Sequence, residues 1–392
     1  MTRMFKGYSS TFYLLCATAL LAMLSTSVVN PLLSIYAKQL GASGIYIGLV
    51  VAGYWVSRIV LEIPSGLIST RFGYYLPMII GLLLTAVGTF LNAFASDPIQ
   101  VMLTRSLQGF GAPLFFAVST TLIVELFDAK HRGSAMGLFQ GIEFAGTIVG
   151  STFSGLIVTS LDFRGSFLLS AVLAGLALAM LVALPQIRMH SRTIKRASSF
   201  SLSSISKVFR SRNLLIVSSA TFTEFIMTSG VLFTVFPIYA QEKLGFSITD
   251  IGFLSGARSI GFVLAMLVMG TVADRIGRKP ILVLGVGLTG VLTLVMSFAT
   301  SFLSFALVIL VSGITTGAIW ITSPVIAAES VEPSLRGAAI GTYRTFFDLG
   351  SIVGPIIMSA LMQVSGPSAC FYLASALFLV NLIPAMKIRE NR

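Results

Sequence analysis

The sequence predicts an all-α integral membrane protein with twelve transmembrane helices, arranged as two parallel six-helix repeats. Three observations support this fold class: the composition, the number of long apolar segments, and an internal repeat. Of the 392 residues, 55% are hydrophobic and only 10% are charged, whereas about a quarter of the residues of a soluble domain are charged. The composition therefore excludes an ordinary soluble or disordered protein.

The apolar segments account for the length of the chain. A bilayer span takes about 20 mainly apolar residues, so twelve spans use about 240 residues and leave the rest for connections. The first apolar segment follows Arg3 and Lys6 and is longer than the apolar region of a signal peptide, so we expect it to be retained. We expect spans at 11–37, 43–69, 76–95, 98–126, 134–159, 165–185, 213–240, 247–272, 280–299, 301–328, 337–363 and 367–386.

The basic residues predict the orientation of these spans. The formal net charge is +12, but the basic residues lie in short gaps between apolar segments, not on one aromatic-rich face of the kind that binds nucleic acid. If both termini are cytoplasmic, the outer loops hold only Lys38, Arg164 and Lys243. The inner segments then hold Arg3, Lys6, Arg71, Lys130, Arg132, Arg188, Arg192, Lys195, Arg196, Lys207, Arg210, Arg212, Arg275, Arg278, Lys279, Arg336, Lys387, Arg389 and Arg392. Because lysine and arginine bias in short loops sets orientation, we expect a multi-pass protein of the cell membrane with both termini in the cytoplasm.

A basic, serine-rich stretch without acidic residues divides the chain in the middle. It reads as a solvated cytoplasmic loop, and it has the composition of segments that dock on anionic lipid or are phosphorylated. We therefore expect an N-terminal six-helix bundle over residues 1–185, a basic cytoplasmic linker over 186–212, and a C-terminal six-helix bundle over 213–392.

The two halves repeat one another. One constant offset, the one that places Gly48 on Gly252, also pairs many other glycines and charged residues without a net insertion. The pairs are Gly66 with Gly270, Arg71 with Arg275, Gly73 with Gly277, Gly81 with Gly285, Gly109 with Gly313, Glu125 with Glu329, Arg132 with Arg336, Gly133 with Gly337, Gly137 with Gly341, Gly146 with Gly350, and Gly150 with Gly354. Parallel six-span repeats are typical of transporters that give alternating access to a site near the bilayer midplane.

The segment after the eighth span, Gly270-Thr-Val-Ala-Asp274-Arg275-Ile-Gly277-Arg278-Lys279, resembles the loop signature of the major facilitator superfamily. Its counterpart after the second span keeps Gly66, Arg71 and Gly73 but has Thr70 where this family usually has aspartate. The resemblance implies a cytoplasmic gating loop at both positions. It also implies that Asp274 carries more of the gating contact than its counterpart does. Glycine permits the tight turn between helices, and an aspartate favours a nearby helix N-terminus.

A second resemblance, to the drug:proton antiporter branch of that family, rests on the fourth and fifth spans. Arg105 and Gln108 share one face of the fourth span, as in the antiporter pattern. The fifth span resembles the antiporter glycine motif at Gly146 and Gly150 but has Ser151 and Ser154 where proline and glycine are usual. The proline occurs instead in the eleventh span, as Pro355, which follows Gly350 and Gly354. Small residues four apart let helices approach closely, so helix packing is the alternative interpretation of these glycines.

Eight charged residues fall well inside the expected spans: Arg58, Arg105, Arg258, Arg344, Glu62, Glu143, Glu224 and Asp348. Each costs about 2.5 to 3.5 kcal/mol at the centre of a span on insertion scales. Arg58 with Glu62, and Arg344 with Asp348, are four residues apart and can pair on one helix face. Glu143 and Glu224 have no charged neighbour on their own spans. We expect the coupling acid among Glu143, Glu224 and Asp348, with Arg105 as the modulator of its proton affinity.

The function these patterns predict is secondary active transport by alternating access, as proton-coupled efflux of drug-like or other small organic compounds. The chain lacks a Gly-x-x-x-x-Gly-Lys-Ser/Thr phosphate loop, so we expect a gradient to drive transport. We expect no catalysis, no cofactor, no bound metal and a monomer. Two alternatives stay open: an organic-anion importer or symporter that uses Arg58, Arg258 and Arg344 as counter-ions, and a transporter-shaped ligand sensor.

Overall fold

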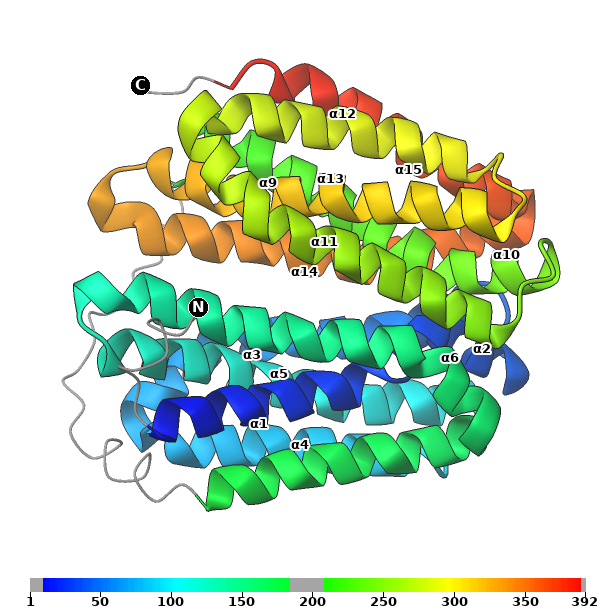
Figure 1. The fold of residues 1–392 in the computed structure, drawn as a ribbon, viewed down its shortest axis with the longest axis horizontal. Coiled ribbons are helices and arrows are strands. Elements are labelled where there is room, and N and C mark those ends of the chain that lie inside the picture. Colours follow the sequence, from blue (N-terminus) through cyan, green and yellow to red (C-terminus); the bar gives the residue numbers. More distant parts are fainter. Residues whose placement is uncertain (1–9, 184–207, 389–392) are drawn as a thin grey trace.

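The computed structural model of the chain describes residues 10–183 and 208–388. In this part of the chain, eleven helical segments are long and apolar enough to cross a membrane. The chain is all-helical over the described ranges (Figure 1). The basic linker expected at 186–212, apart from its last five residues, lies outside the described residues.

The first half occupies one side of the molecule in Figure 1 and the second half the other. The elements of the first half are α1 (Ser10–Ser27), η1 (Asn30–Leu32), α2 (Leu33–Gln39), α3 (Ile45–Phe72), α4 (Tyr75–Asn92), α5 (Pro98–Leu126) and α6 (Ala129–Val182). The elements of the second half are α9 (Arg212–Phe225), η2 (Ile226–Val235), α10 (Phe236–Glu242), α11 (Ile248–Ile276), α12 (Arg278–Met296), α13 (Phe302–Glu329), η3 (Pro333–Leu335), α14 (Arg336–Ser365) and α15 (Pro367–Ala385).

The long helix α6 comprises two of the expected spans. Its 54 residues would extend about 80 Å as one straight helix, far more than a bilayer core. Asp162 breaks it with φ 57° and ψ 176°, values that are uncommon for a residue with a side chain. The chain turns back at that point (Figure 1). The twelve expected spans are therefore present, with the fifth and sixth continuous in sequence.

Side-chain caps and glycine turns set the ends of the other helices. Asp97 accepts hydrogen bonds from the backbone N–H groups at the start of α5, and Ser247 with Asp250 forms a capping box at the start of α11. Gly73, between α3 and α4, and Gly277, between α11 and α12, have φ angles of 79° and 100°. These two turns are equivalent in the internal repeat, and both need the backbone freedom of glycine.

The paired glycines pack equivalent helices together in the two halves. A Cβ on Gly146 would lie 2.6 Å from the Leu20 carbonyl oxygen of α1, and a Cβ on Gly350 would lie 2.5 Å from the Phe222 carbonyl oxygen of α9. Gly354 is equally close to η2, where a Cβ would lie 2.7 Å from the Ile226 Cα atom. Helix packing within each half is thus what these positions do in the structure.

The two halves touch at one end of the bundle and separate at the other. At the end formed by Gln39 and Glu242, a Cβ on Gly252 of α11 would lie 2.6 Å from the backbone nitrogen of Gly155 on α6. Lys38 of α2 and Glu242 of α10 form an ion pair across the same end. We call this the closed end; the end where α1 begins and α15 finishes is the open end.

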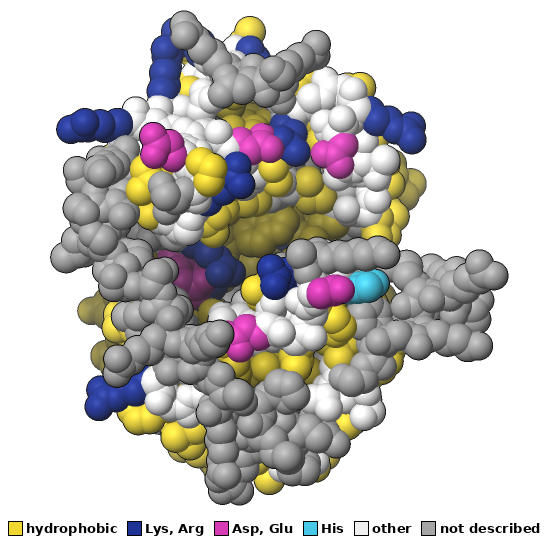
Figure 2. Space-filling view, turned by 90° about the vertical axis from the view of Figure 1, so that its left-hand side faces the viewer, with side chains coloured by type: hydrophobic (Ala, Val, Ile, Leu, Met, Phe, Trp, Pro, Cys, Tyr) yellow, Lys and Arg dark blue, Asp and Glu magenta, His cyan; other side chains and the backbone are white. Residues whose placement is uncertain are grey.

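At the open end, glycines of both halves face empty space. A Cβ on Gly137 or Gly141 of α6, or on Gly337 or Gly341 of α14, would meet no atom within 4 Å. Figure 2 views this end and shows a hollow between the two halves, with hydrophobic side chains at its base and charged side chains around it. Over the described residues, the bundle is therefore open at one end and closed at the other.

Candidate functional site

The hollow leads to a central cavity of about 310 Å³ lined by both halves. Its walls come from α1, η1, α2, α3, α5 and α6 on one side and from α9, η2, α11, α13 and α14 on the other. Nearly all of the intramembrane charged residues expected from the sequence line this cavity. The cavity lining includes Arg58, Glu62, Arg105, Glu143, Glu224, Arg258 and Arg344, and Asp348 is fully buried beside it in contact with Arg58.

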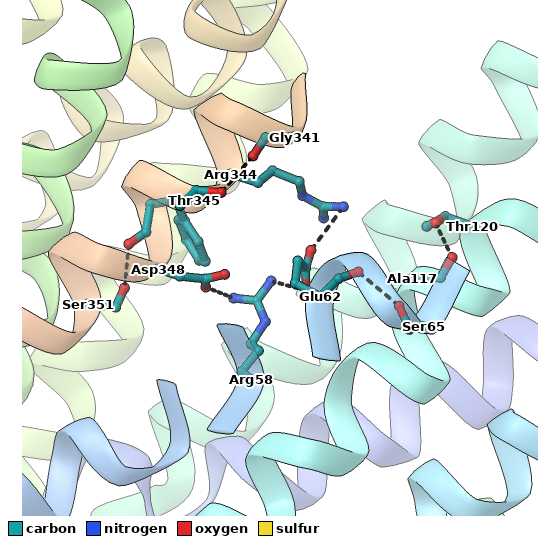
Figure 3. Close-up of polar contacts among 11 residues, drawn as sticks. Arg58, Glu62, Ser65, Ala117, Thr120, Gly341, Arg344, Thr345, Asp348 and Ser351 are labelled. Atoms are coloured by element: carbon teal, nitrogen blue, oxygen red, sulfur yellow. Dashed lines mark hydrogen bonds and ion pairs between the residues drawn. The ribbon is translucent and has the colours of Figure 1, made fainter. Parts of the chain in front are cut away.

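Arg58 of α3 is at the centre of a charge network that joins the two halves (Figure 3). Its guanidinium lies 2.9 Å from an Asp348 Oδ atom of α14 and 3.4 Å from a Glu62 Oε atom of its own helix. Arg344 of α14 reaches back to the other Glu62 Oε atom at 3.2 Å. Charges on α3 are thus neutralised both by each other and by charges on α14.

This network differs from the same-helix pairing allowed by the sequence. Arg58 and Glu62 do pair on α3, but Arg344 pairs with Glu62 rather than with Asp348. The reason is the contact between α3 and α14, which places opposite charges of the two helices face to face. Residue spacing along a single helix could not predict these ion pairs between α3 and α14.

Glu224 of α9 forms a second, smaller polar cluster. It is 2% exposed, and one Oε atom lies 3.8 Å from an Arg258 guanidinium nitrogen of α11. The Thr228 hydroxyl donates to the same Oε atom at 2.9 Å and accepts from Arg258 at 2.8 Å. Thr228 therefore relays the contact between the acid and the arginine.

Arg105 and Glu143 have different surroundings from these pairs. Arg105 of α5 donates to the Asn30 side-chain oxygen at 2.7 Å and to that of Gln108 at 3.2 Å, and Gln108 in turn donates to the Thr89 hydroxyl at 2.9 Å. Over the described ranges neither Arg105 nor Glu143 has an oppositely charged group within 4.0 Å. Arg105 therefore does not contact any of the three candidate acids in this state.

Aromatic rings cover much of the remaining wall. Trp320 lies 5.7 Å from Phe347 and 6.2 Å from Phe262, and Trp55 lies 5.4 Å from Phe347, measured between ring centroids. The Arg58 guanidinium lies 4.8 Å from the Phe347 ring centroid, within cation–π range. The cavity thus combines flat apolar faces with fixed charges, the composition of sites that hold small organic ligands.

The gating-loop residues lie at the open end. Arg278 pairs with Asp274 at 3.6 Å and also with Glu329 of α13, and the Asp274 side chain is 71% exposed. Arg71 at the end of α3 lies over the Phe72 ring. Nearby, Asp128 caps α6 and bonds to the His131 side chain, which holds the pKa of this carboxyl below its usual value. All these contacts stay within one half.

Positions of the other predicted loop residues follow from the helix ends. Gly66 and Gly270 lie on α3 and α11 and would give a Cβ no neighbour within 4 Å. Arg275 is in the last turn of α11, and Lys279 is in the first turn of α12. These residues surround the open end of the bundle.

Several cavity residues were not predicted from the sequence. Asn30 follows the end of α1 and precedes Pro31, and its side chain is an acceptor for Arg105. The Asn-Pro pair was the available signal, because such a pair favours a break in a helix. Thr228 lies on the polar face that it shares with Glu224 in the sequence, but the π-helical segment η2, which carries Ser229 and Phe233 into the cavity wall, has no comparable signal. Such segments occur frequently at functional sites.

A family model and several relatives match most of this chain. A family model described as Major Facilitator Superfamily matches residues 15–247 and 219–392. Quinolone resistance protein NorA of Staphylococcus aureus is 23% identical over 377 residues, covering 95% of each chain. Multidrug resistance protein 2 of Bacillus subtilis is 23% identical over 376 residues, covering 93% of this chain and 92% of that protein. An uncharacterized MFS-type transporter of Methanocaldococcus jannaschii is 23% identical over 389 residues, covering 96% and 98%.

Solved structures share the fold. The nucleoside transporter NupG superposes with a TM-score of 0.79 at 12% identity, covering 97% of this chain and 99% of that one. A bacterial homolog of the human lysosomal transporter Spinster, in an inward-facing and unoccupied conformation, superposes with a TM-score of 0.80 at 11% identity, covering 97% of each chain. At these identities the likeness concerns the fold alone.

Proposed function

The chain belongs to the major facilitator superfamily, and on that premise we propose that it exports small organic compounds by alternating access, driven by protons entering through the same cavity. Membership makes the protein a multi-pass membrane transporter and not an enzyme. The observation that carries the proposal is the central cavity, where membrane-embedded carboxylates of both halves meet a wall of aromatic rings. The named multidrug and quinolone resistance relatives support organic compounds as the substrate class.

Alternating access is supported by the asymmetry between the two ends. The closed end is sealed by contacts between α6 and α11 and by the ion pair of Lys38 with Glu242. A second state would reverse this arrangement, bringing the glycines of the open end together. Because a ligand shifts such an equilibrium only if it binds the two states differently, coupling requires groups whose surroundings change between the states.

We assign proton coupling to Glu143, Glu224 and Asp348. A carboxylate close to an arginine keeps its charge, and one in apolar surroundings favours the protonated form. Movement of α11 relative to α9 would separate Arg258 from Glu224, and separation of α3 from α14 would remove Arg58 from Asp348. The importer alternative is less well supported, because Arg58, Arg258 and Arg344 are all engaged by acids of the protein.

A substrate-panel flux assay tests this function. Purified protein in liposomes is given an imposed pH gradient, and the movement of cationic, zwitterionic, anionic and neutral aromatic compounds is followed in both directions. Export against a gradient that is abolished by a protonophore supports the proposal. Saturable binding without flux for every compound would favour the ligand-sensor alternative, and uptake of anions alone would favour the importer.

The bundle domains and the orientation are further parts of the proposal. We place the open end in the cytoplasm and expect a tag at Ser198, which lies outside the described residues, to be cytoplasmic, and a tag near Asp162 to face outward. Basic residues are concentrated at the open end, and charge bias sets topology. Protease access in sealed vesicles of known orientation measures this, and an external tag at Ser198 would reverse the assignment.

Asp274→Asn is expected to shift the population toward the state seen here. In this state Asp274 pairs with Arg278 of its own half and is exposed, so neutralising it costs little. On closure of the open end, pseudo-symmetry places Asp274 near the N-terminus of α6, where negative charge is favoured by roughly 0.3 to 1 kcal/mol. Labelling of Thr120→Cys, a cavity residue, should become faster from the open end. An unchanged labelling rate would count against this gating role.

A further inference from the structure

The charges of the central cavity leave one cation and one anion without an ionic partner. Arg58 and Arg344 share Glu62 and Asp348, and Arg258 is paired with Glu224. The exceptions, within the described ranges, are Arg105 and Glu143. Both line the cavity. Arg344 and Arg58 act on Glu143 electrostatically, but neither lies within 4.0 Å of it, so Glu143, like Arg105, is available to a bound molecule.

Arg105 is a buried cation surrounded by neutral groups. Its side chain is held by the oxygen atoms of Asn30 and Gln108, and its guanidinium lies 5.3 Å from the Tyr54 ring centroid. The residue is 6% exposed, and its Nε atom is buried without a hydrogen-bond partner. A buried charge is costly unless it is paired and hydrogen-bonded, so this position favours the approach of an anion.

The internal repeat shows that the first helix of the first half offers no acid to the cavity. The offset that places Gly48 on Gly252 places Leu20 of α1 opposite Glu224 and Leu24 opposite Thr228. The second half therefore supplies an acid and a hydroxyl from its first helix to Arg258, whose counterpart under this offset is Tyr54, whereas the first half has two leucines at these positions. The segment from α1 to α2 contains no acidic residue. The segment from α1 to α2 therefore supplies no carboxylate to Arg105.

Glu143 provides the opposite charge at another depth of the cavity. It lies on α6 between the cavity residues Gln140 and Thr147. Arg105 lies about 10 Å along α5 from its start at the closed end, and Glu143 lies roughly 28 Å along α6 from the turn at Asp162. The two groups are thus separated along the bundle axis, with the aromatic wall of Trp55, Trp320 and Phe347 in the same cavity.

We propose that the cavity selects elongated aromatic zwitterions, with the substrate carboxylate bound at Arg105 and the substrate amine at Glu143. This inference rests on the proposed function, because it names the substrate class of the transport site. Arg105 acts by its two-pronged guanidinium, which suits a carboxylate, and Glu143 acts as the counter-ion of an ammonium group. The carboxylate subsite has one competing source of ligand, a free anion such as chloride.

Intrinsic fluorescence gives a direct measure of cavity occupancy. The chain has two tryptophans, and both of them, Trp55 and Trp320, line the cavity. The probes are 4′-(aminomethyl)biphenyl-4-carboxylic acid, its methyl ester, its N-acetyl derivative and the doubly blocked compound. These four share one aromatic body and differ only in which charge is present. Titrations are made on the purified wild-type chain in a low-salt buffer without chloride and in the same buffer with added chloride.

Wild-type protein is expected to bind the zwitterion about tenfold more tightly than either singly blocked compound, the effect typical of one hydrogen-bonded charged contact. In Arg105→Gln the zwitterion should bind no better than its methyl ester, while the affinity of the ester stays unchanged. In Glu143→Gln the zwitterion should bind no better than its N-acetyl derivative. Arg164→Gln, which removes an arginine at the closed end outside the cavity lining, is the matched control and should keep the wild-type preference.

Arg105→Lys guards against misfolding of the glutamine variant, because it keeps the charge and loses the fork geometry. It should retain a reduced preference for the carboxylate. Equal wild-type affinities for the zwitterion and its ester would overturn the inference, as would a preference that survives in Arg105→Gln. A chloride-dependent signal without carboxylate preference would assign Arg105 to a free anion and also overturn it. Selective binding with flux that ignores the pH gradient would sink the proposed proton coupling and support the substrate class.

Discussion

Glu224→Gln is expected to abolish accumulation driven by a pH gradient while leaving ligand binding in the cavity measurable. A tenfold proton gradient is worth about 1.4 kcal/mol for each proton and sustains about tenfold accumulation of substrate when one proton is exchanged. The amide keeps the size of the carboxyl and can accept the Thr228 hydrogen bond, but it cannot gain or lose a proton. The driven component should therefore fall to the level of passive leak.

Glu143→Gln should have the same effect on accumulation, since this acid lines the cavity without an ionic partner among the described residues. Asp348→Asn is the contrasting variant, because Arg58 lies 2.9 Å from Asp348 and favours its charged form in this state. Efflux and counterflow are measured side by side in the same liposomes, with binding followed by tryptophan fluorescence. If all three neutralised variants keep full gradient-driven flux, these acids are structural, and uniport or coupling to another ion replaces proton coupling.

Gly252→Leu should prevent the closed end from forming and drive the protein toward an outward-open state. A Cβ at this position would lie 2.6 Å from the Gly155 backbone nitrogen, and neither helix backbone can yield without separating α6 from α11. Ile47, which is 3% exposed near the same end, becomes reachable when that end opens. Outside labelling of Ile47→Cys by an impermeant maleimide should therefore rise strongly, and transport should stop.

Gly175→Leu is the matched control for this variant, because a Cβ there meets no atom within 4 Å. Gly341→Leu supplies the opposite case: its surroundings are empty now and would be crowded if the open end closed. Gly341→Leu should permit the state described here and block the state in which the open end is closed. Wild-type labelling of Ile47→Cys in the Gly252→Leu background would show that the glycine contact is not part of the seal.

Sequence reasoning performed best where a single helix carries the signal. The apolar segments predicted twelve spans, and even the turn inside α6 was expected from the gap between the fifth and sixth segments. The glycine repeat predicted a two-fold architecture because glycine is required wherever equivalent backbones approach closely. These properties depend on local composition and spacing, which survive in one sequence.

Contacts between the two halves were harder to predict from the sequence. The spacing of Arg344 and Asp348 allowed a pair on α14, yet the partner of each lies on α3, because a short distance between two helices outweighs neighbourhood on one helix. The same limit applies to Arg105, whose expected role assumed a nearby acid; the structure surrounds it with Asn30, Gln108 and Tyr54. Which cavity charges stay unpaired depends on tertiary packing and could not be read from spacing.

Proton movement driven by substrate is the most direct test of the central claim, that acids of the cavity exchange protons for substrate. Liposomes containing the protein and a trapped pH indicator receive an outwardly directed substrate gradient without any imposed pH gradient. We predict a substrate-dependent change of internal pH in the direction of antiport, absent in Glu224→Gln and abolished by a protonophore. Substrate flux of normal size with no pH change in the wild-type protein would contradict the account.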